Sequence, residues 1–363
     1  MRVVEPTDAA VRRLLAVCRW EGIDPAAARV VADLTPGLSG ATVLRVDLGA
    51  PGARGRSVVL KALRAEDDRG PGAFRRGPSG ARREADVHRA GIVAVLTDEV
   101  VTPDVRAIGT VDGVVCLWFA DVTDQLDVPW DVAAAVRAVE AVAGLHLGVL
   151  PPGTRGADWA SSEYDAFRHH VPAATRRVKE ELAGADGGRP SLVPPRDAGL
   201  ALRLLDGAED FARQLAAAPT GFQHGGFHTD NAGRAQDGRL LLIDWAQAGV
   251  GPLGGDIAVF LSNYQARGGD RGGLGRRAFD ALITDAYGRA LAARGADRAL
   301  VRAARRVIDL WSVSWGVQVR LGPGLAAARD ASLDPEVRAS VAQDIAEGLA
   351  RARDAEARLT SAG

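Results

Sequence analysis

The chain has 363 residues, of which 47% are hydrophobic and 25% are charged, and its formal net charge is −1. This composition is typical of a globular protein with a sizeable core, and it excludes a disordered, collagenous or fibrous chain. Because 45 basic residues are balanced by 46 acidic ones, the chain has no general basic field. We therefore expect neither nucleic acid nor a membrane surface as a partner.

Cysteine usage and the amino terminus indicate the compartment. Cys18 and Cys116 are the two cysteines, and they lie far apart in the sequence, so neither a disulfide framework nor a cysteine zinc site is expected. The amino-terminal segment carries charges throughout and lacks the apolar core of a signal peptide. No uncharged apolar run reaches the about 18 residues of a membrane span. We expect a cytoplasmic protein.

The first third of the chain is rich in strand-like patterns. Apolar residues recur at helical spacing over residues 8–20. Short β-branched runs separated by Gly and Pro turns then predict three antiparallel strands over 28–36, 38–49 and 56–65. A helix is predicted over 81–92, after a polar loop that is rich in glycine and proline.

Two further strands are predicted over residues 101–122, around the dipeptide Asp112-Gly113, which is typical of a tight hairpin turn. Residues 1–122 are therefore expected to form a small antiparallel sheet with one inserted helix. We interpret this part as an amino-terminal lobe.

From residue 128 on, helical patterns replace the strand patterns. The predicted helices cover residues 128–150, 159–183, 198–218, 276–294, 296–320 and 335–359. A polar connector is expected over 184–199, and a short β-rich stretch over 221–249 interrupts the helices. The predicted fold class is α+β, with two lobes: the small sheet of residues 1–122 and a larger helical lobe over residues 123–363.

The stretch 221–249 contains the residues that are best suited to chemistry. Asn231 precedes a turn and Asp244 ends the apolar strand that follows it, and their oxygens are hard ligands of the kind that Mg²⁺ prefers. Upstream, Lys61 ends an apolar strand, and Glu84 on the next helix is its expected carboxylate partner. A lysine held in this way can bridge nucleotide phosphates.

Taken in order, these segments resemble the aminoglycoside phosphotransferase family, a branch of the protein-kinase-like superfamily. The likeness covers residues from about 30 to 260. Val-Val-Leu-Lys, ending at Lys61, is similar to the lysine strand, and Arg-Arg-Glu-Ala-Asp, with Glu84, to the glutamate helix. His-Gly-Gly-Phe-His-Thr-Asp-Asn, residues 224–231, is similar to the catalytic loop, and the strand ending at Asp244 to the metal-binding strand.

The resemblance implies a protein-kinase-like fold that binds ATP, or GTP, together with Mg²⁺. It implies that Lys61 and Glu84 serve the phosphates and that Asn231 and Asp244 hold the metal. It also implies a nucleotide loop and a hinge that grips the base through backbone groups. The corresponding positions are Ser39, Gly40, Trp118, Phe119, Ala120 and Asp121.

One position departs from the family pattern His-Gly-Asp-x-x-x-x-Asn. Its aspartate accepts or orients the proton of the acceptor hydroxyl, and here Gly226 stands in that place. Because His224 and Asn231 keep the expected spacing, the expected catalytic carboxylate is absent. Asp230 and His228 are the candidate catalytic residues in its stead; an unperturbed histidine pKa near 6.5 suits proton transfer.

Other conspicuous residues have simpler interpretations. His224 and His146 are expected to be structural, and the arginines of residues 72–83 to lie on a solvated loop. Trp311 and Trp315 are spaced to share one helical face, which favours core packing, with an acceptor pocket as the second interpretation.

We therefore predict a phosphotransferase that acts on the hydroxyl of an unidentified small-molecule acceptor and that is weak or atypical because of Gly226. Two alternatives remain open. One is a pseudokinase, a nucleotide-binding scaffold with a protein partner. The other is a kinase-fold enzyme that performs different chemistry in natural-product biosynthesis.

Overall fold

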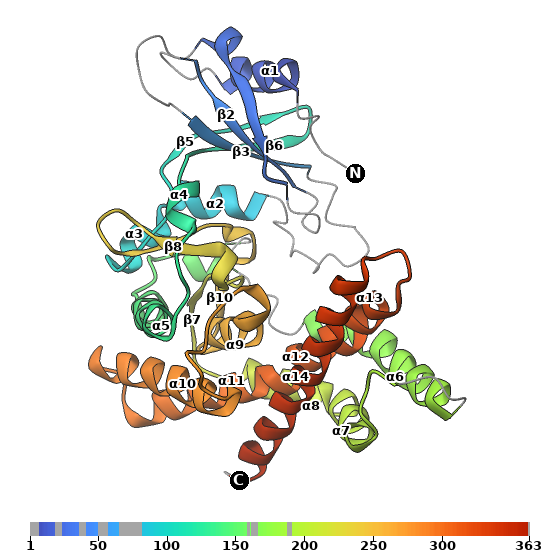
Figure 1. The fold of residues 1–363 in the computed structure, drawn as a ribbon. Helices are drawn as coiled ribbons and strands as arrows, with labels where there is room; N and C mark the ends of the chain where they lie inside the picture. Colours follow the sequence, from blue (N-terminus) through green and yellow to red (C-terminus); the bar gives the residue numbers. More distant parts are fainter. Residues whose placement is uncertain are drawn as a thin grey trace. The chain divides into compact units, whose positions relative to one another are not determined.

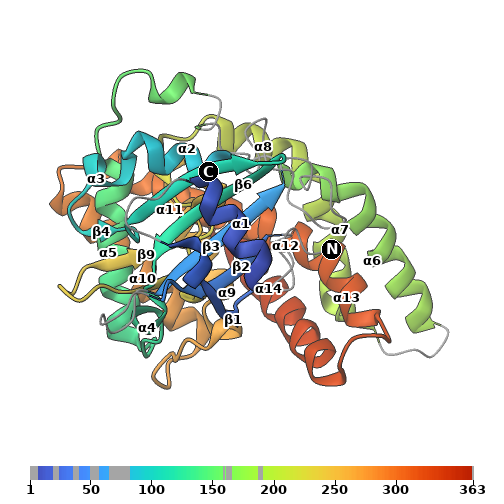
Figure 2. The same ribbon diagram turned by 90° about the horizontal axis from the view of Figure 1, so that it is seen from above.

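The structure is a computed structural model that describes residues 7–18, 24–35, 41–49, 57–64, 82–157, 160, 166–186 and 191–361 (Figures 1 and 2). The chain forms two compact units. The first consists of residues 1–128, 149–161 and 230–249, and the second of residues 129–148, 162–229 and 250–363. The division into residues 1–122 and 123–363 stays a prediction. Within the described ranges, none of the helices combines the length and the apolar character that a bilayer crossing needs.

A five-stranded antiparallel sheet forms the centre of the first unit, in the strand order β1-β2-β3-β6-β5. Its strands are β1 (Arg29–Asp33), β2 (Thr42–Asp47), β3 (Ser57–Arg64), β5 (Val105–Val111) and β6 (Val114–Ala120). The five predicted strands are thus confirmed. The hairpin turn expected at Asp112-Gly113 is present as well, with both residues at positive φ.

The two faces of this sheet bury different side chains. Helix α1 (Asp8–Cys18) packs on one face, against a cluster that includes Leu60 and Trp118. The other face belongs to a cluster that includes Phe119 and Ala85 of helix α2 (Arg83–Ala90). Because side chains alternate along a strand, Lys61 of β3 points to the α2 face. This alternation is what brings Lys61 and Glu84 to the same side of the sheet.

A second, three-stranded sheet of the first unit has the order β4-β9-β8. Its strands are β4 (Val100–Val101), β8 (Ala232–Arg234) and β9 (Leu240–Leu242), and the short helices α3 (Ile92–Leu96) and α4 (Thr123–Leu126) belong to the same unit. At Gly233 a Cβ atom would lie 2.3 Å from the carbonyl oxygen of Gln125, so only glycine allows this approach of α4 to the hairpin.

The second unit is mainly helical. Its longer helices are α5 (Val132–Leu147), α6 (Val171–Asp186), α7 (Pro195–Asp206), α8 (Ala208–Ala216), α9 (Gly255–Asn263), α10 (Arg276–Ala293), α11 (Arg298–Val313) and α14 (Pro335–Ser361). The short helices α12 (Trp315–Val319) and α13 (Leu325–Arg329) flank a π-helical turn over Arg320–Gly324. Strands β7 (Thr220–Gln223) and β10 (Gly249–Pro252) form a two-stranded sheet.

Several predicted helix boundaries need correction. The helix predicted over 198–218 is two helices with a break at Gly207, and the one predicted over 296–320 is interrupted at Ser314. The connector expected over 184–199 is shorter, because α6 continues to Asp186 and α7 begins at Pro195. Proline is favoured in the first turn of a helix, where its missing N–H costs nothing.

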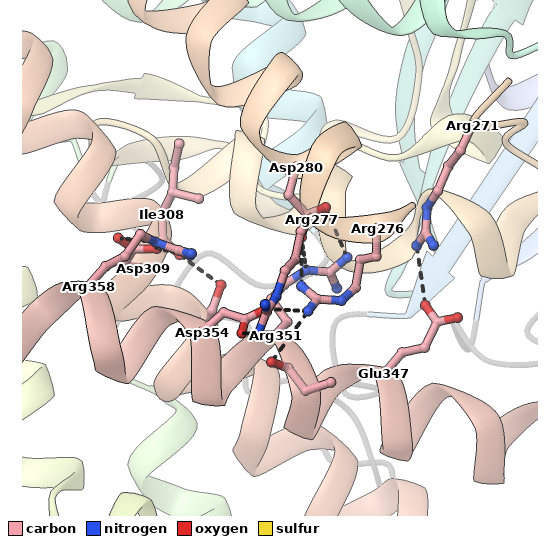
Figure 3. A network of polar contacts seen from close by, with 12 residues as sticks. Arg271, Arg276, Arg277, Asp280, Ile308, Asp309, Glu347, Arg351, Asp354 and Arg358 are labelled. Carbon is pink, nitrogen blue, oxygen red and sulfur yellow. Dashed lines mark hydrogen bonds and ion pairs between the residues drawn. The ribbon is translucent and has the colours of Figure 1, made fainter. Parts of the chain in front are cut away.

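Helix α14 is fixed by apolar contacts and by ion pairs. Ile345, Leu349 and Ala352 belong to the buried cluster that also contains residues of α6 and α7. On another side of the helix, Asp354 pairs with Arg276 and Arg277 of α10, and Arg351 donates to Asp280 of α10 at 3.0 Å. Arg358 pairs with Asp309 of α11 at 2.6 Å. Figure 3 shows these pairs as one network that joins α10, α11 and α14.

Candidate active site

Lys61 is buried at the centre of a cluster of charges in the first unit. Its Nζ atom lies 2.6 Å from Oε2 of Glu84 and also contacts Oδ1 of Asp244. The expected pairing of Lys61 with Glu84 is therefore confirmed. Burial by itself would lower the pKa of Lys61, but the charges of Asp244 and Glu84 outweigh it and hold this pKa above its ordinary value. The lysine is thus charged at neutral pH.

Glu84 has a second task besides pairing with Lys61. Its Oε1 atom accepts a hydrogen bond from the backbone N–H of Trp245 at 3.2 Å. Burial raises the pKa of Glu84, while the charge of Lys61 opposes that shift. One carboxylate therefore links the lysine strand to the segment that follows Asp244.

Arg83 strengthens the same connection. Its Nη1 atom donates to the carbonyl oxygen of Ala248 at 3.5 Å, and only 2% of the residue is exposed. The expectation of a solvated loop is therefore wrong for Arg83, while residues 72–81 lie outside the described residues. Nothing in the local sequence distinguishes Arg83 from its neighbour Arg82, because burial here follows from the orientation of the whole helix. The first turn of α2 holds the segment from Asp244 to Ala248 at two points.

Asp244 has an unusual backbone conformation. Its φ and ψ angles are 61° and 66°, in the left-handed region that residues other than glycine rarely adopt. Such a conformation costs about 1–3 kcal/mol and is found preferentially at functional sites. The other described non-glycine residue with positive φ is Asp112, in the β5–β6 hairpin turn. The structure thus concentrates strain on the aspartate that was predicted to bind metal.

The hairpin of β8 and β9 brings Asn231 close to Asp244. Ala232 pairs with Leu242 in the register of the two strands, and the N–H of Ile243 donates to the carbonyl oxygen of Asn231 at 3.0 Å. Asn231 is therefore opposite the residue that precedes Asp244. The two predicted metal ligands lie at the same end of one hairpin.

The predicted hinge residues differ in what their side chains do. The side chain of Trp118 is fully buried on the α1 face, and its backbone lies in β6 between β3 and β5. The N–H of Ala120 donates to the carbonyl oxygen of Asp104 at 2.8 Å. Ser39 and Gly40, the predicted residues of the nucleotide loop, lie outside the described residues.

Asp121 has a structural role at the end of β6. Its carboxylate accepts hydrogen bonds from Arg45 at 2.5 Å, from the hydroxyl of Ser57, and from the N–H and hydroxyl of Thr123 at 3.1 and 2.7 Å. Burial would raise the pKa of Asp121, but the hydrogen bonds from Ser57 and Thr123 hold it below its usual value. This side chain anchors the strand end.

His88 is a residue of this site that sequence reasoning missed. It lies one helical turn after Glu84, and its ring packs edge-on against Phe119 with 5.2 Å between ring centroids. Burial, together with the nearby charge of Lys61, lowers the pKa of His88 to about 4. Its spacing of four residues from Glu84 was the available signal, because residues i and i+4 share a helical face.

In the second unit, a buried aspartate fixes the loop that follows β7. Asp256 accepts hydrogen bonds from the N–H of His224 and the N–H of Gly225, both at 2.8 Å. His146 contacts the same carboxylate through Nε2 at 3.0 Å. The N–H of Gly226 donates to Nδ1 of His224 at 3.2 Å. Both histidines are buried and hydrogen-bonded, so the prediction that they are structural is confirmed.

The residues around Gly226 have distinct environments. Gly225 has a φ of +78°, whereas the φ of Gly226 is not positive, so the backbone angle at buried Gly226 does not itself require glycine. Phe227 is fully buried and stacks on Phe260 at 4.8 Å. His228 is half-buried, and Asp230, at the start of the first unit's hairpin segment, is exposed.

The tryptophans of α11 and α12 lie as their spacing predicts. Trp311 and Trp315 stack with 6.2 Å between ring centroids, and Trp315 also packs edge-on against Phe167. Trp315 belongs to a buried cluster with residues of α8 and α11. Core packing is therefore the role that these contacts support.

Comparison with known proteins agrees with this fold. The chain belongs to the phosphotransferase enzyme family, whose sequence model matches residues 61–300. No curated protein sequence matches the chain significantly.

Solved structures extend the likeness to nearly the whole chain. An AMP-bound spectinomycin phosphotransferase has a TM-score of 0.56 at 10% identity, covering 94% of this chain and 97% of its own. An amicoumacin kinase in complex with AMP-PNP and Ca²⁺ has a TM-score of 0.54 at 13% identity, covering 93% and 92%. An aminoglycoside phosphotransferase from Alicyclobacillus acidocaldarius has a TM-score of 0.53 at 16% identity, covering 92% of each chain. The predicted α+β, protein-kinase-like fold is thereby confirmed.

Proposed function

We propose that the chain is a small-molecule phosphotransferase that uses ATP, or GTP, with Mg²⁺ to phosphorylate a hydroxyl group of an acceptor. The observation that carries this proposal is the pairing of buried Lys61 with buried Glu84 and with partly exposed Asp244, within a chain of the phosphotransferase enzyme family. The sequence contains only one other lysine, Lys179, which is exposed on α6. Burying a lysine requires partners, and this one has two carboxylates.

The charge balance of the cluster favours a cation beside Asp244. One ammonium and two carboxylates leave one net negative charge, and the side chain of Asp244 is 38% exposed and so accessible to a cation. Asn231 at the same hairpin end adds a neutral oxygen donor. Two protein oxygens suit Mg²⁺, which usually takes its remaining ligands from water and from nucleotide phosphates. When bound, the metal neutralises charge on the phosphates.

The remaining roles follow the family pattern. Lys61 contacts the phosphates and Glu84 holds Lys61 in place, while the backbone from Trp118 to Val122 binds the base. Ser39 and Gly40 contribute backbone N–H groups to the phosphates. We infer a small-molecule acceptor, because the solved structures that this fold resembles include a spectinomycin phosphotransferase and an amicoumacin kinase.

Gly226 makes the proposed activity atypical. Phosphoryl transfer passes through a loose transition state, so positioning and charge neutralisation supply most of the catalysis. A general base adds about 10²–10⁴-fold. Without a carboxylate at Gly226, we expect slow transfer, with exposed Asp230 or half-buried His228 as the substitute that orients the acceptor hydroxyl.

The second candidate function is a pseudokinase that binds nucleotide and a protein partner without turnover. The observation that favours it is the glycine at position 226, whose N–H is bonded to His224 and which has no side chain to accept a proton. Both candidates require nucleotide binding, and they differ in turnover.

Titration calorimetry with Mg·ATP, followed by turnover assays with and without candidate acceptors, tests the proposal. Lys61→Ala is expected to weaken ATP binding at least about tenfold, which corresponds to the loss of about 1.4 kcal/mol. Lys179→Ala, the matched control, is expected to bind as the wild type does. Absence of binding at millimolar ATP would refute both candidate functions, and binding without turnover would favour the pseudokinase.

A further inference from the structure

A chain of buried hydrogen bonds leads from α10 to the loop after β7. The hydroxyl of Tyr287 lies 2.7 Å from Nδ1 of His146, and Nε2 of His146 lies 3.0 Å from Oδ2 of Asp256. Asp256 in turn accepts the N–H groups of His224 and Gly225. The first three residues are 0–2% exposed, and they belong to α10, α5 and α9 of the same unit.

The direction of each proton in this chain follows from the donors and acceptors present. Burial would raise the pKa of Asp256, but the hydrogen bond from His146 and the contacts with His224 hold it below its ordinary value. An ionised carboxylate only accepts hydrogen bonds, so Nε2 of His146 must carry a proton. In the tautomer that carries its proton on Nε2, Nδ1 is an acceptor.

Tyr287 is the donor to that acceptor. The phenol is neutral, since burial raises its pKa well above the ordinary value, and its oxygen is hydrogen-bonded to the backbone of Gly254. A backbone N–H donates, so the oxygen accepts from Gly254 and its own proton is directed to His146. Both ring nitrogens of His146 are therefore satisfied, and the orientation of the ring is fixed from two sides.

We propose that Tyr287 is a positioning residue for the loop from His224 to Gly226, acting through His146 and Asp256. The effect of Tyr287 on catalysis rests on the proposed function, whereas its effect on the loop does not. The hydroxyl of Tyr287 fixes the tilt of the imidazole, whose tautomer is set by the carboxylate of Asp256. The imidazole orients the carboxylate of Asp256, and the carboxylate holds the two N–H groups that set the loop backbone.

The position of the loop matters because it leads directly into the predicted active-site residues. Gly226 follows the two held N–H groups by one residue, and Asp230 and Asn231 follow it in the chain. Because position 226 has no carboxylate, the loop contributes to transfer mainly through the position of its backbone, which places the residues that follow. A loss of loop order is therefore expected to lower the transfer rate more than the affinity for nucleotide.

Tyr287→Phe tests the inference, because it removes only the hydroxyl. Tyr264→Phe is the matched control, because Tyr264 is equally buried in the same unit. Its hydroxyl lies within hydrogen-bond distance of three backbone carbonyl oxygens, those of Trp130, Asp131 and Asp270. Amide hydrogen exchange at His224 and Gly225 should accelerate at least about tenfold in Tyr287→Phe, the factor that follows from a loss of about 1.4 kcal/mol. In Tyr264→Phe these two amides should exchange as in the wild type.

Two further measurements separate positioning from a general loss of stability. The ring nitrogen resonances of His146, in a two-bond ¹H–¹⁵N correlation spectrum, should shift at Nδ1 in Tyr287→Phe and stay unchanged in Tyr264→Phe. With an acceptor that is phosphorylated, kcat should fall at least about tenfold in Tyr287→Phe, which corresponds to about 1.36 kcal/mol in the activation free energy. The KM for ATP should stay within about twofold of the wild-type value.

A second variant guards against misfolding of the first. His146→Gln keeps a side-chain N–H donor for Asp256 and loses the ring that Tyr287 contacts, so it should reproduce the faster exchange at His224 and Gly225. Exchange at these two amides that is equal in wild type, Tyr287→Phe and His146→Gln would overturn the inference. A wild type without turnover would refute the proposed function, whereas the exchange and resonance measurements would still decide for or against the coupling.

Discussion

Glu84 and Trp245 are joined by a hydrogen bond from the backbone N–H of Trp245 to the carboxylate, at 3.2 Å. The carboxylate that neutralises Lys61 therefore also fixes the residue next to Asp244. A lysine on one strand and an aspartate at the end of another are held by a single side chain on α2. A change at Glu84 should consequently disturb both at once.

Replacement of Glu84 tests this double role. Glu84→Ala leaves Lys61 with one carboxylate and the N–H of Trp245 without an acceptor, and we expect it to lower the free energy of unfolding by about 3–5 kcal/mol. Glu84→Gln keeps an oxygen for Trp245 and should cost less. Denaturant unfolding measures both. Glu209→Gln, at an exposed ion pair with Arg168, is the control and should change stability by no more than about 1 kcal/mol. Equal losses for Glu84→Gln and Glu209→Gln would contradict the double role.

His88 should make stability depend on pH. Its pKa is about 4 in the folded chain and near 6.5 when unfolded, so between these values the unfolded state binds more protons. The stabilisation is complete above pH 6.5 and is lost progressively as the pH falls toward about 4. His88→Leu should remove this part of the pH dependence, which urea unfolding at several pH values between 4.5 and 7.5 will show. If the free energy of unfolding changed with pH in the same way in wild type and variant, this would argue against a neutral His88 in the folded protein.

Gly226→Asp should increase phosphoryl transfer or slow ATP hydrolysis, because the φ of Gly226 is compatible with a side chain. The expected gain is at most the about 10²–10⁴-fold that a general base contributes. Gly225→Asp is the control; at a φ of +78° it should destabilise the fold by about 1–2 kcal/mol and bring no gain. Turnover is measured with coupled ADP detection.

The substitute base is tested in the wild-type background. Asp230→Ala or His228→Ala should abolish transfer if that residue orients the acceptor hydroxyl. Wild-type turnover at ordinary kinase rates of ~1–100 s⁻¹, unaffected by either change, would refute this account of the loop.

The network of Figure 3 predicts where helix α14 is most sensitive. Asp354 has a side chain that is 8% exposed and pairs with Arg276 and Arg277, so Asp354→Ala removes the carboxylate that Arg277 contacts and one of the two that Arg276 contacts, the other being Asp280. We expect a loss of about 1–3 kcal/mol, which is below the about 3–5 kcal/mol for removing one partner of a fully buried pair, because Arg277 is exposed and Arg276 keeps Asp280. Glu356→Ala, two residues further on at a pair with exposed Arg203, should cost no more than about 1 kcal/mol. Thermal and denaturant unfolding distinguish the two; similar small losses would mean that the network does not fasten the helix.

Much of the fold could be predicted because the elements have strong local signals. The strands of the first sheet have turn residues at their ends, and alternation along β3 fixes the face of Lys61. The pair of Lys61 and Glu84 was predictable because a buried lysine needs a carboxylate and the helix supplied one.

The missed features depend on contacts between remote segments. Tyr287 is 141 residues away from His146, and no local pattern connects them. The burial of Arg83 depends on Ala248, which is 165 residues away. The breaks at Gly207 and Ser314 interrupt continuous helical periodicity, so the pattern alone predicted longer helices. Tertiary packing decides such positions.

The left-handed backbone of Asp244 has a consequence for how this chain can evolve. Glycine at this position would relieve the backbone strain, but it would also remove one of the two carboxylates that neutralise Lys61. Substitutions at position 244 are therefore constrained from two directions, by the left-handed backbone and by the charge of Lys61.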